Sequence, residues 1–233
     1  MPELPKLTSL HVSSVRSNSE NQSSSNLPTT MAYDEPIIIH ARPKTDLWRK
    51  PPNVDVDNAP TRLISTPIDI HKFHSARITV SADWNTLYDQ GGLILFIPGE
   101  DATIWMKTGI EFFEGKPFVG SVVTSQWSDW ALVPLGKEKG GKVTILVERQ
   151  VKEGKKLDSL WVYVIDEETG RKMEVRQITW WFTHDIQDQK ISDDRCLLIG
   201  VYAARPTVPA GEGREHEELV VKLEGFEVKL FDD

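Results

Sequence analysis

The sequence has a single cysteine among its 233 residues, which excludes an intramolecular disulfide as a source of stability. Cys196 stands directly before the apolar segment Leu197–Ile199, so we expect it to pack as a small apolar side chain. A catalytic thiol needs a histidine partner, and no pattern in the sequence connects one with this cysteine. A cysteine nucleophile is therefore not predicted.

Long hydrophobic runs and an excess of positive charge are also missing. The longest apolar stretch, Leu93–Ile97, is too short to span a bilayer, and residues 1–30 contain no run of the length that a secretory signal needs. The 27 Lys and Arg residues against 35 Asp and Glu give a formal net charge of −8. Nucleic acids and anionic membranes bind through concentrated Lys and Arg, so neither is expected as a partner. We expect a cytoplasmic protein that can also enter the nucleus.

Residues 1–32 are rich in Ser and Asn and poor in aromatic side chains. Such a composition cannot bury enough apolar surface to offset the entropy that is lost on ordering. We therefore predict a disordered tail over residues 1–32. The remaining residues 33–233 are predicted to form one domain, because β-sandwiches of about 200 residues commonly fold as one unit.

Helical periodicity over three or four turns is absent from this domain, and short β-branched or aromatic segments recur between Gly, Pro and Asp. The glycine-containing segments 114–116, 139–142 and 168–170 have the composition of hairpin turns. The polar stretch Thr183–Asp194 is predicted to be a strand-free surface loop. Many short strands at regular spacing indicate an all-β sandwich or barrel.

The segment Trp105–Phe113 has the alternation of a strand, in which successive side chains face opposite sides. Met106 and Ile110 fall on one side, which we interpret as the core. Trp105, Lys107 and Glu111 fall on the other side, where an aromatic ring and two charged groups suit a sugar or another small polar ligand. The alternative is a solvated sheet face that carries Lys107 and Glu111 without binding anything.

Several segments in a fixed order resemble a family of fungal and bacterial domains labelled "regulation of enolase protein". The resemblance covers roughly Ile37 to Phe231 and rests on six segments: Asp46–Arg49, Leu87–Leu93, Trp105–Phe112, Ser121–Thr124, Ser128–Trp130 and Gly200–Pro206. It implies a concanavalin A-like lectin/glucanase fold, which is a jelly-roll sandwich of two antiparallel sheets, one of them concave.

Carried over to this sequence, the polar and aromatic residues of these motifs are candidates for lining the concave sheet. The candidate ligand-binding residues are Tyr88, Asp89, Gln90, Trp105, Lys107, Glu111, Ser121, Thr124, Asp129 and Trp130. For Trp130 and Tyr202, burial between the sheets is the favoured alternative. Asp89 has the alternative role of shaping the turn before Gly91.

Three functions remain open. The first is a non-catalytic protein that recognises a carbohydrate or phosphosugar on the concave sheet and regulates carbohydrate metabolism. The second is a glycoside hydrolase or lyase, which needs two carboxylates across the scissile bond. The Glu-x-Asp-x-x-Glu stretch of the superfamily's glucanases is absent here, so Glu111 would need Asp89 or Asp129 on another strand. The third is an adaptor that binds a glycolytic enzyme, and it rests on the family label alone.

Neither a cofactor nor a metal ion is expected. The sequence contains no phosphate loop and no dinucleotide-binding fingerprint. The acidic residues Asp185, Asp188, Asp193 and Asp194 share one segment, but their spacing is more typical of a solvated loop than of a calcium site. The sequence therefore favours a binding protein over an enzyme.

Overall fold

The computed structural model describes residues 30–99, 102–136, 140–183, 185–186, 189–190 and 195–232. The described residues form antiparallel strands that pair into two seven-stranded sheets. The predicted disorder of residues 1–29 lies outside the described residues, as do Asp188, Asp193 and Asp194.

The first sheet has the strand order β1–β18–β7–β12–β13–β14, and β2 also pairs with β18. Its strands are β1 (Thr30–Tyr33), β2 (Ile37–Ala41), β7 (Phe73–Ser81), β12 (Lys142–Lys152), β13 (Lys155–Ile165), β14 (Lys172–Ile178) and β18 (Leu219–Leu230).

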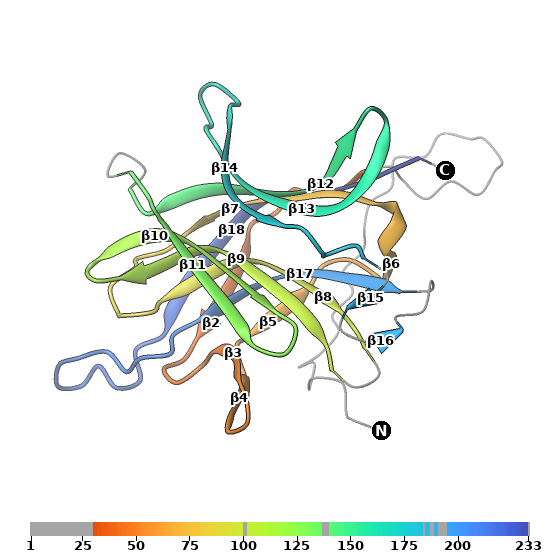
Figure 1. Ribbon diagram of the computed structural model, residues 1–233. Coiled ribbons are helices and arrows are strands. Elements are labelled where there is room, and N and C mark those ends of the chain that lie inside the picture. Colours follow the sequence, from red (N-terminus) through yellow and green to blue (C-terminus); the bar gives the residue numbers. More distant parts are fainter. Residues whose placement is uncertain are drawn as a thin grey trace.

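The second sheet has the order β11–β10–β9–β8–β17–β5, and β6 also pairs with β17. Its strands are β5 (Thr61–Leu63), β6 (Ile68–Asp69), β8 (Gln90–Ile97), β9 (Ile104–Phe113), β10 (Lys116–Thr124), β11 (Ser128–Pro134) and β17 (Cys196–Ala204). Figure 1 shows the two sheets as stacked layers, with β12 and β13 in one and β8, β9 and β10 in the other.

Two hairpins lie outside the sheets. One consists of β3 (Leu47–Lys50) and β4 (Val54–Asp57), and the other of β15 (Asp185–Ile186) and β16 (Gln189–Lys190). Within the described ranges the helical structure is one 3-10 turn, Ile70–Lys72, where Asp69 accepts a hydrogen bond from the backbone N–H of His71. No helix in this part of the chain is long and apolar enough to cross a membrane.

The apolar run Leu93–Ile97 is buried on both faces of β8, and this explains why it shows no alternation. Leu93, Leu95 and Ile97 point into the main core between the sheets. Ile94 and Phe96 point to the opposite face, where they form a second cluster with Trp105, Val122, Tyr202 and Leu47 of the β3–β4 hairpin. The hairpin therefore covers the outer face of the second sheet.

The prediction of an all-β protein with two antiparallel sheets is confirmed. The turns at Gly115 and Gly170 are also confirmed, with φ of 78° and 70°. Two other predictions differ from the structure. Residues 30–32 of the predicted tail belong to β1, which pairs with β18. The segment 183–194, predicted to be strand-free, contains the β15–β16 hairpin.

Candidate functional site

The site is built on the outer face of β9. Met106 and Ile110 point into the core between the sheets, as the alternation predicts. Lys107 and Glu111 point to the other side, but they are only 2% and 7% exposed. The alternative of a solvated sheet face is therefore wrong, because the β3–β4 hairpin and the aromatic residues around it exclude water from both charged groups.

A cavity of about 220 Å³ lies on this face between the sheet and the β3–β4 hairpin. Its lining residues come from five strands and the segments next to them: Asp46, Trp48, Tyr88, Gln90, Lys107, Glu111, Val122 and Trp130. Pockets for drug-sized ligands measure about 300–1,000 Å³, so this cavity is matched to a smaller molecule.

Lys107 is held by a carboxylate and two aromatic rings. Its Nζ donates a hydrogen bond of 3.0 Å to Oδ1 of Asp46. The same nitrogen lies 5.9 Å from the ring centroid of Trp105 and 5.8 Å from that of Tyr202, which are cation–π distances. Burial lowers the pKa of Lys107, and the attraction of Asp46 and Glu111 opposes this shift.

Glu111 shares the cavity with Lys107. Trp130 donates a hydrogen bond of 2.9 Å from Nε1 to Oε2 of Glu111. Burial raises the pKa of Glu111 to about 7, although Lys107 and the indole of Trp130 favour its ionised form. A carboxyl group that titrates near neutrality can accept or release a proton under physiological conditions.

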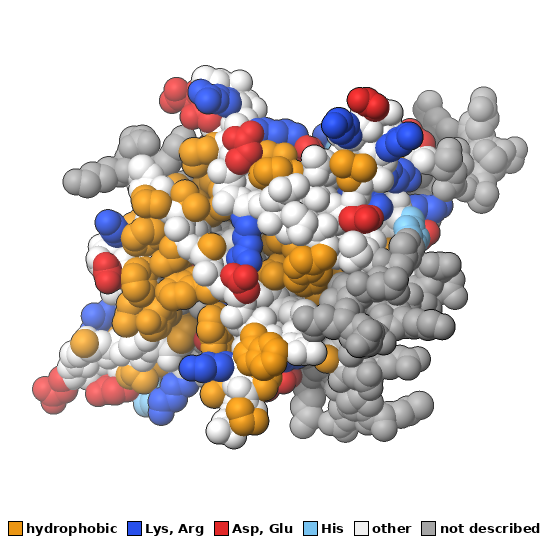
Figure 2. All heavy atoms as spheres, in the orientation of Figure 1, with side chains coloured by type: hydrophobic (Ala, Val, Ile, Leu, Met, Phe, Trp, Pro, Cys, Tyr) orange, Lys and Arg blue, Asp and Glu red, His pale blue; other side chains and the backbone are white. Residues whose placement is uncertain are grey.

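Aromatic rings form the wall of the cavity. Trp130 makes edge-to-face contacts with Trp48 and Tyr88, with centroid distances of 6.5 Å and 6.2 Å. The aromatic contacts continue to Phe113, 5.6 Å from Trp130, and from there to Phe118. Figure 2 shows hydrophobic side chains gathered over β10 and β11. Trp130 is 36% exposed, so the favoured alternative of burial between the sheets is wrong for this residue.

Two backbone features make room for this arrangement. Tyr88 has a φ of 66°, which is uncommon for a residue other than glycine, and its N–H donates a 2.7 Å hydrogen bond to the carbonyl oxygen of Phe112. Gly120 lies beneath Glu111, and a Cβ atom at this position would approach Oε2 of Glu111 to 2.8 Å. A side chain at position 120 would therefore displace the carboxyl group of Glu111.

The structure brings half of the predicted site residues together. Those that line the cavity are Tyr88, Gln90, Lys107, Glu111 and Trp130. Trp105 is buried beneath Lys107, with 3% of its surface exposed, so it supports the lysine and offers no open platform to a ligand.

Asp89 and Asp129 lie away from the cavity. Asp89 is fully buried and forms an ion pair with Arg205, with 2.8 Å between Oδ1 and Nε. Asp129 points away from the outer face and pairs with Arg176, with 3.0 Å between Oδ1 and Nη2. The structure therefore does not bring either aspartate to Glu111 as the second carboxylate that hydrolysis would need.

Ser121 and Thr124 are also outside the cavity lining. Ser121 alternates with Val119 and Val123, which belong to the core between the sheets, and it is fully buried on that side. Thr124 faces outward, where its hydroxyl lies 2.9 Å from the hydroxyl of Ser128. The Thr124 hydroxyl therefore connects β10 with β11, whereas the Ser121 hydroxyl has no hydrogen-bond partner among the described residues.

Three cavity residues, Asp46, Trp48 and Val122, are absent from the predicted site, and the two that come from outside the sheet are Asp46 and Trp48. They belong to the Asp46–Arg49 segment, one of the six that carry the family resemblance. The family resemblance identified this segment but could not show that it packs over β9. The hydrogen bond between Asp46 and Lys107 joins residues that are 61 positions apart in the chain. Arg49 anchors the hairpin by donating from Nη1 to the carbonyl oxygens of Thr103 and Ser125, at 3.1 Å and 3.0 Å.

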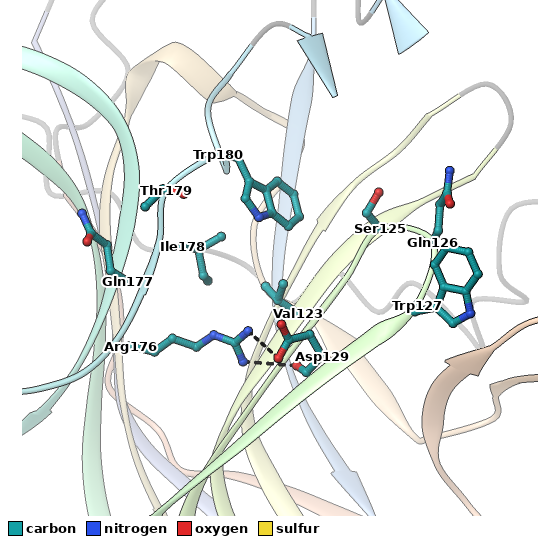
Figure 3. Close-up of a pocket in the computed structure, with 10 residues that line it drawn as sticks. All are labelled: Val123, Ser125, Gln126, Trp127, Asp129, Arg176, Gln177, Ile178, Thr179 and Trp180. Carbon is teal, nitrogen blue, oxygen red and sulfur yellow. Dashed lines mark hydrogen bonds and ion pairs between the residues drawn. The ribbon is translucent and has the colours of Figure 1, made fainter. Parts of the chain in front are cut away.

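A second groove, of about 310 Å³, lies where the β10–β11 turn faces β14. Figure 3 shows Arg176 pointing from β14 toward Asp129. Trp127 and Trp180 also line the groove, and Trp127 is 57% exposed. This groove is larger than the cavity, but its charged groups already satisfy each other and the Asp129 side chain is 73% exposed. The cavity with its buried Lys107 and Glu111 is therefore the better candidate for a functional site.

Residues 25–230 match a protein family described as "Protein of unknown function (DUF1349)". An uncharacterized protein of Emericella nidulans is 38% identical over 194 residues, which cover 81% of this chain and 88% of the relative. "Regulation of enolase protein 1" of Saccharomyces cerevisiae is 28% identical over 100 residues, or 43% of this chain and 48% of the relative. The resemblance to the regulation-of-enolase proteins is therefore confirmed.

Two solved structures have the same fold. A functionally unknown protein from Saccharomyces cerevisiae has a TM-score of 0.60 and 20% identity, and the match covers 90% of this chain and all of that one. A mutant of the GH43 protein BlXynB from Bacillus licheniformis has a TM-score of 0.51 and 12% identity, over 82% of this chain and 32% of that one. The concanavalin A-like jelly-roll sandwich implied by the resemblance is confirmed.

Proposed function

The chain belongs to the family described as "Protein of unknown function (DUF1349)", and we propose that it is a sugar-binding protein whose ligand is a small neutral carbohydrate. The ligand occupies the cavity between β9 and the β3–β4 hairpin. The observation that carries this proposal is the combination of aromatic walls with buried hydrogen-bonding charges in one small cavity.

Both halves of this combination suit a sugar ring. The indoles of Trp48 and Trp130 offer apolar surfaces to the C–H groups of a pyranose. Asp46, Lys107 and Glu111 offer acceptors and donors to its hydroxyl groups. Small-molecule sites generally combine such apolar walls with a few polar groups that fix the ligand's orientation.

The charges of the cavity favour a neutral sugar over a phosphosugar. Lys107 is the one basic residue in the lining, and it already donates to Asp46. Glu111 adds a second carboxyl group beside it. A phosphate here would face two carboxyl groups with no unshared cation, and such like-charge contacts reject a ligand. We therefore narrow the proposed ligand to an unphosphorylated sugar.

Replacing Trp130 with alanine is expected to weaken sugar binding at least tenfold. The substitution removes an aromatic wall and the indole donor that holds Glu111. A tenfold loss corresponds to about 1.4 kcal/mol, which is modest for an aromatic residue that contacts the ligand. Titration calorimetry with D-glucose, D-galactose, D-xylose, cellobiose and glucose 6-phosphate would measure the effect on the full chain.

Trp127→Ala is the matched control, since Trp127 is an exposed tryptophan of the same hairpin that lines the groove and not the cavity. This variant should bind the sugar like the wild type. The proposal fails if none of the neutral sugars binds, or if the two variants behave alike. Binding of glucose 6-phosphate in preference to glucose would overturn the choice of a neutral ligand.

The name of the yeast relative, "Regulation of enolase protein 1", suggests a regulatory role. We propose that this role depends on the same cavity. In this proposal the bound sugar is the signal, and a metabolic enzyme is the partner that responds to it. Trp130→Ala separates the two parts, because an adaptor that acts without sugar would keep its partner in a pull-down with this variant.

A further inference from the structure

The cavity places a proton acceptor and a proton donor against one small volume. Glu111 and Lys107 both line it, on the same face of β9. Their side chains are fixed, since Trp130 donates to Glu111 at 2.9 Å and Lys107 donates to Asp46 at 3.0 Å. Two groups of this kind, both mostly buried and facing one cavity, are what general acid–base catalysis on a bound ligand needs.

The size of the cavity limits the substrate. At about 220 Å³ it falls below the range for drug-sized ligands, so we expect it to enclose one sugar ring. The opening and closing of the ring is a reaction that a single reducing sugar can undergo with one acid and one base.

We propose that this protein catalyses the interconversion of the α and β anomers of a reducing sugar, with Glu111 and Lys107 as catalytic residues. This inference rests on the proposed function, because the sugar must first occupy the cavity. It adds an activity to the binding site and assigns a role to each of the two buried charges.

The reaction balances without any further reactant. The Glu111 carboxylate takes the proton of the anomeric hydroxyl group while the Lys107 ammonium gives a proton to the ring oxygen. The bond between C1 and the ring oxygen breaks, and C1 becomes an aldehyde carbonyl. After rotation about the C1–C2 bond, the hydroxyl group formed from the ring oxygen attacks the other face of the carbonyl. Its proton returns to Lys107, and the proton on Glu111 returns to the anomeric oxygen. No atom or electron is gained or lost.

The environment of the two groups suits this exchange. Burial raises the pKa of Glu111 to about 7 and lowers the pKa of Lys107, so both shifts reduce the difference in proton affinity between base and acid. Among the described residues, the titratable groups that face Glu111 are Lys107, Asp46, Tyr88 and Tyr202, and burial keeps the pKa of Tyr202 well above its ordinary value. Tyr202 therefore stays neutral when Glu111 titrates. Besides contacting the sugar, Asp46 positions Lys107, because its carboxylate accepts the hydrogen bond from the Lys107 ammonium.

The test follows the anomers of freshly dissolved α-D-glucose and α-D-galactose by ¹H NMR with the full chain present at pH 7. We expect an approach to equilibrium faster than in buffer, in proportion to protein concentration. Glu111→Gln should lose at least about 100-fold of this added rate, as expected for removing a general base. Asp129→Asn is the control, since Asp129 is a carboxylate outside the cavity, and it should keep the wild-type rate.

The pH profile separates catalysis from support of the fold. The wild-type rate should rise with pH through about 7 as Glu111 loses its proton. Asp46 raises the pKa of Lys107, so Asp46→Asn should move the decline of the rate at higher pH toward lower pH. A merely structural role for Asp46 would lower the rate at every pH without moving the profile.

Titration calorimetry on the same samples, with the non-interconverting methyl α-D-glucoside and methyl α-D-galactoside beside the free sugars, distinguishes the possible failures. If a sugar binds but its anomers equilibrate no faster than in buffer, the catalytic inference is overturned and the binding function stands. If no sugar binds to the wild type, both are overturned. An unchanged added rate in a folded Glu111→Gln variant also overturns the inference.

Discussion

Asp89→Asn is expected to lower the free energy of unfolding by about 3–5 kcal/mol, the usual cost of removing one partner of a buried ion pair. Arg205 donates to both carboxylate oxygens of Asp89, at 2.8 Å from Nε and 2.9 Å from Nη2. Oδ2 also accepts from the backbone N–H groups of Asn85 and Thr86. Asparagine keeps the size of the side chain, but its amide group would face these donors with a donor of its own. As a counter-charge among the described residues, the buried guanidinium would keep only the more distant Glu217 carboxylate, 3.6 Å from its Nη1.

Asp129→Asn is the matched control for this prediction. Asp129 is also paired with an arginine, but its side chain is 73% exposed. Exposed ion pairs contribute about 0–1 kcal/mol, so this variant should unfold close to the wild-type midpoint. Urea titrations of the three proteins measure the difference. A cost below about 1 kcal/mol for Asp89→Asn would show that the Asp89–Arg205 pair does not support the fold in the way we describe.

Between pH 4.5 and 7, the stability of the wild type should contain a contribution that decreases by about 3 kcal/mol, and Glu111→Gln should remove it. The unfolded chain releases the Glu111 proton near the ordinary value of 4.5, whereas the folded protein holds it until about 7. Between these values the unfolded state binds fewer protons, so rising pH favours unfolding, and above pH 7 the loss is complete.

The measurement is the free energy of unfolding of wild type and Glu111→Gln at a series of pH values, taken as a difference. The difference is needed because His74 titrates in an overlapping range with the opposite sign. Burial lowers its pKa from 6.5, so its contribution to stability increases as pH rises. His74 is present in both proteins and cancels. If the two pH curves run parallel from pH 4.5 to 8, Glu111 ionises in the folded protein as it does in the unfolded chain.

These two predictions describe opposite uses of a buried carboxyl group. Asp89 meets a full set of donors and stabilises the fold. Glu111 receives one indole hydrogen bond and shares Lys107 with Asp46, and this environment leaves its charged form unfavourable. A group that is retained at a cost to stability is a candidate for function, which is why we place the proposed chemistry at Glu111.

Much of the site could be predicted from local sequence. The alternation of Trp105–Phe113 correctly separated Met106 and Ile110, which lie in the core, from Lys107 and Glu111, which face the cavity. The motifs also contained Asp46 and Trp48. The burial of this face could not be predicted, because a charged residue on one face of a strand has the same pattern whether water or another segment covers it.

The structural roles of Asp89 and Asp129 could not be predicted from the sequence either. Asp89 and Asp129 both stand in matching motifs next to aromatic or polar residues, and both were candidates for the ligand site. Their arginine partners come from elsewhere in the chain, Arg205 being 116 positions from Asp89. No local pattern indicates such a partner, so sequence alone could not separate a structural carboxylate from a functional one.

Backbone preferences and a period of two residues were enough to predict the all-β class, the turns at Gly115 and Gly170, and the side of β9 that each residue occupies. The position of the β3–β4 hairpin over this side, which brings Asp46 to Lys107, could be seen only in the folded protein. The chemistry of the site depends on this packing. The proton affinities of Lys107 and Glu111 are set by desolvation, and desolvation is a property of the segments that pack over a residue and not of its neighbours in the chain.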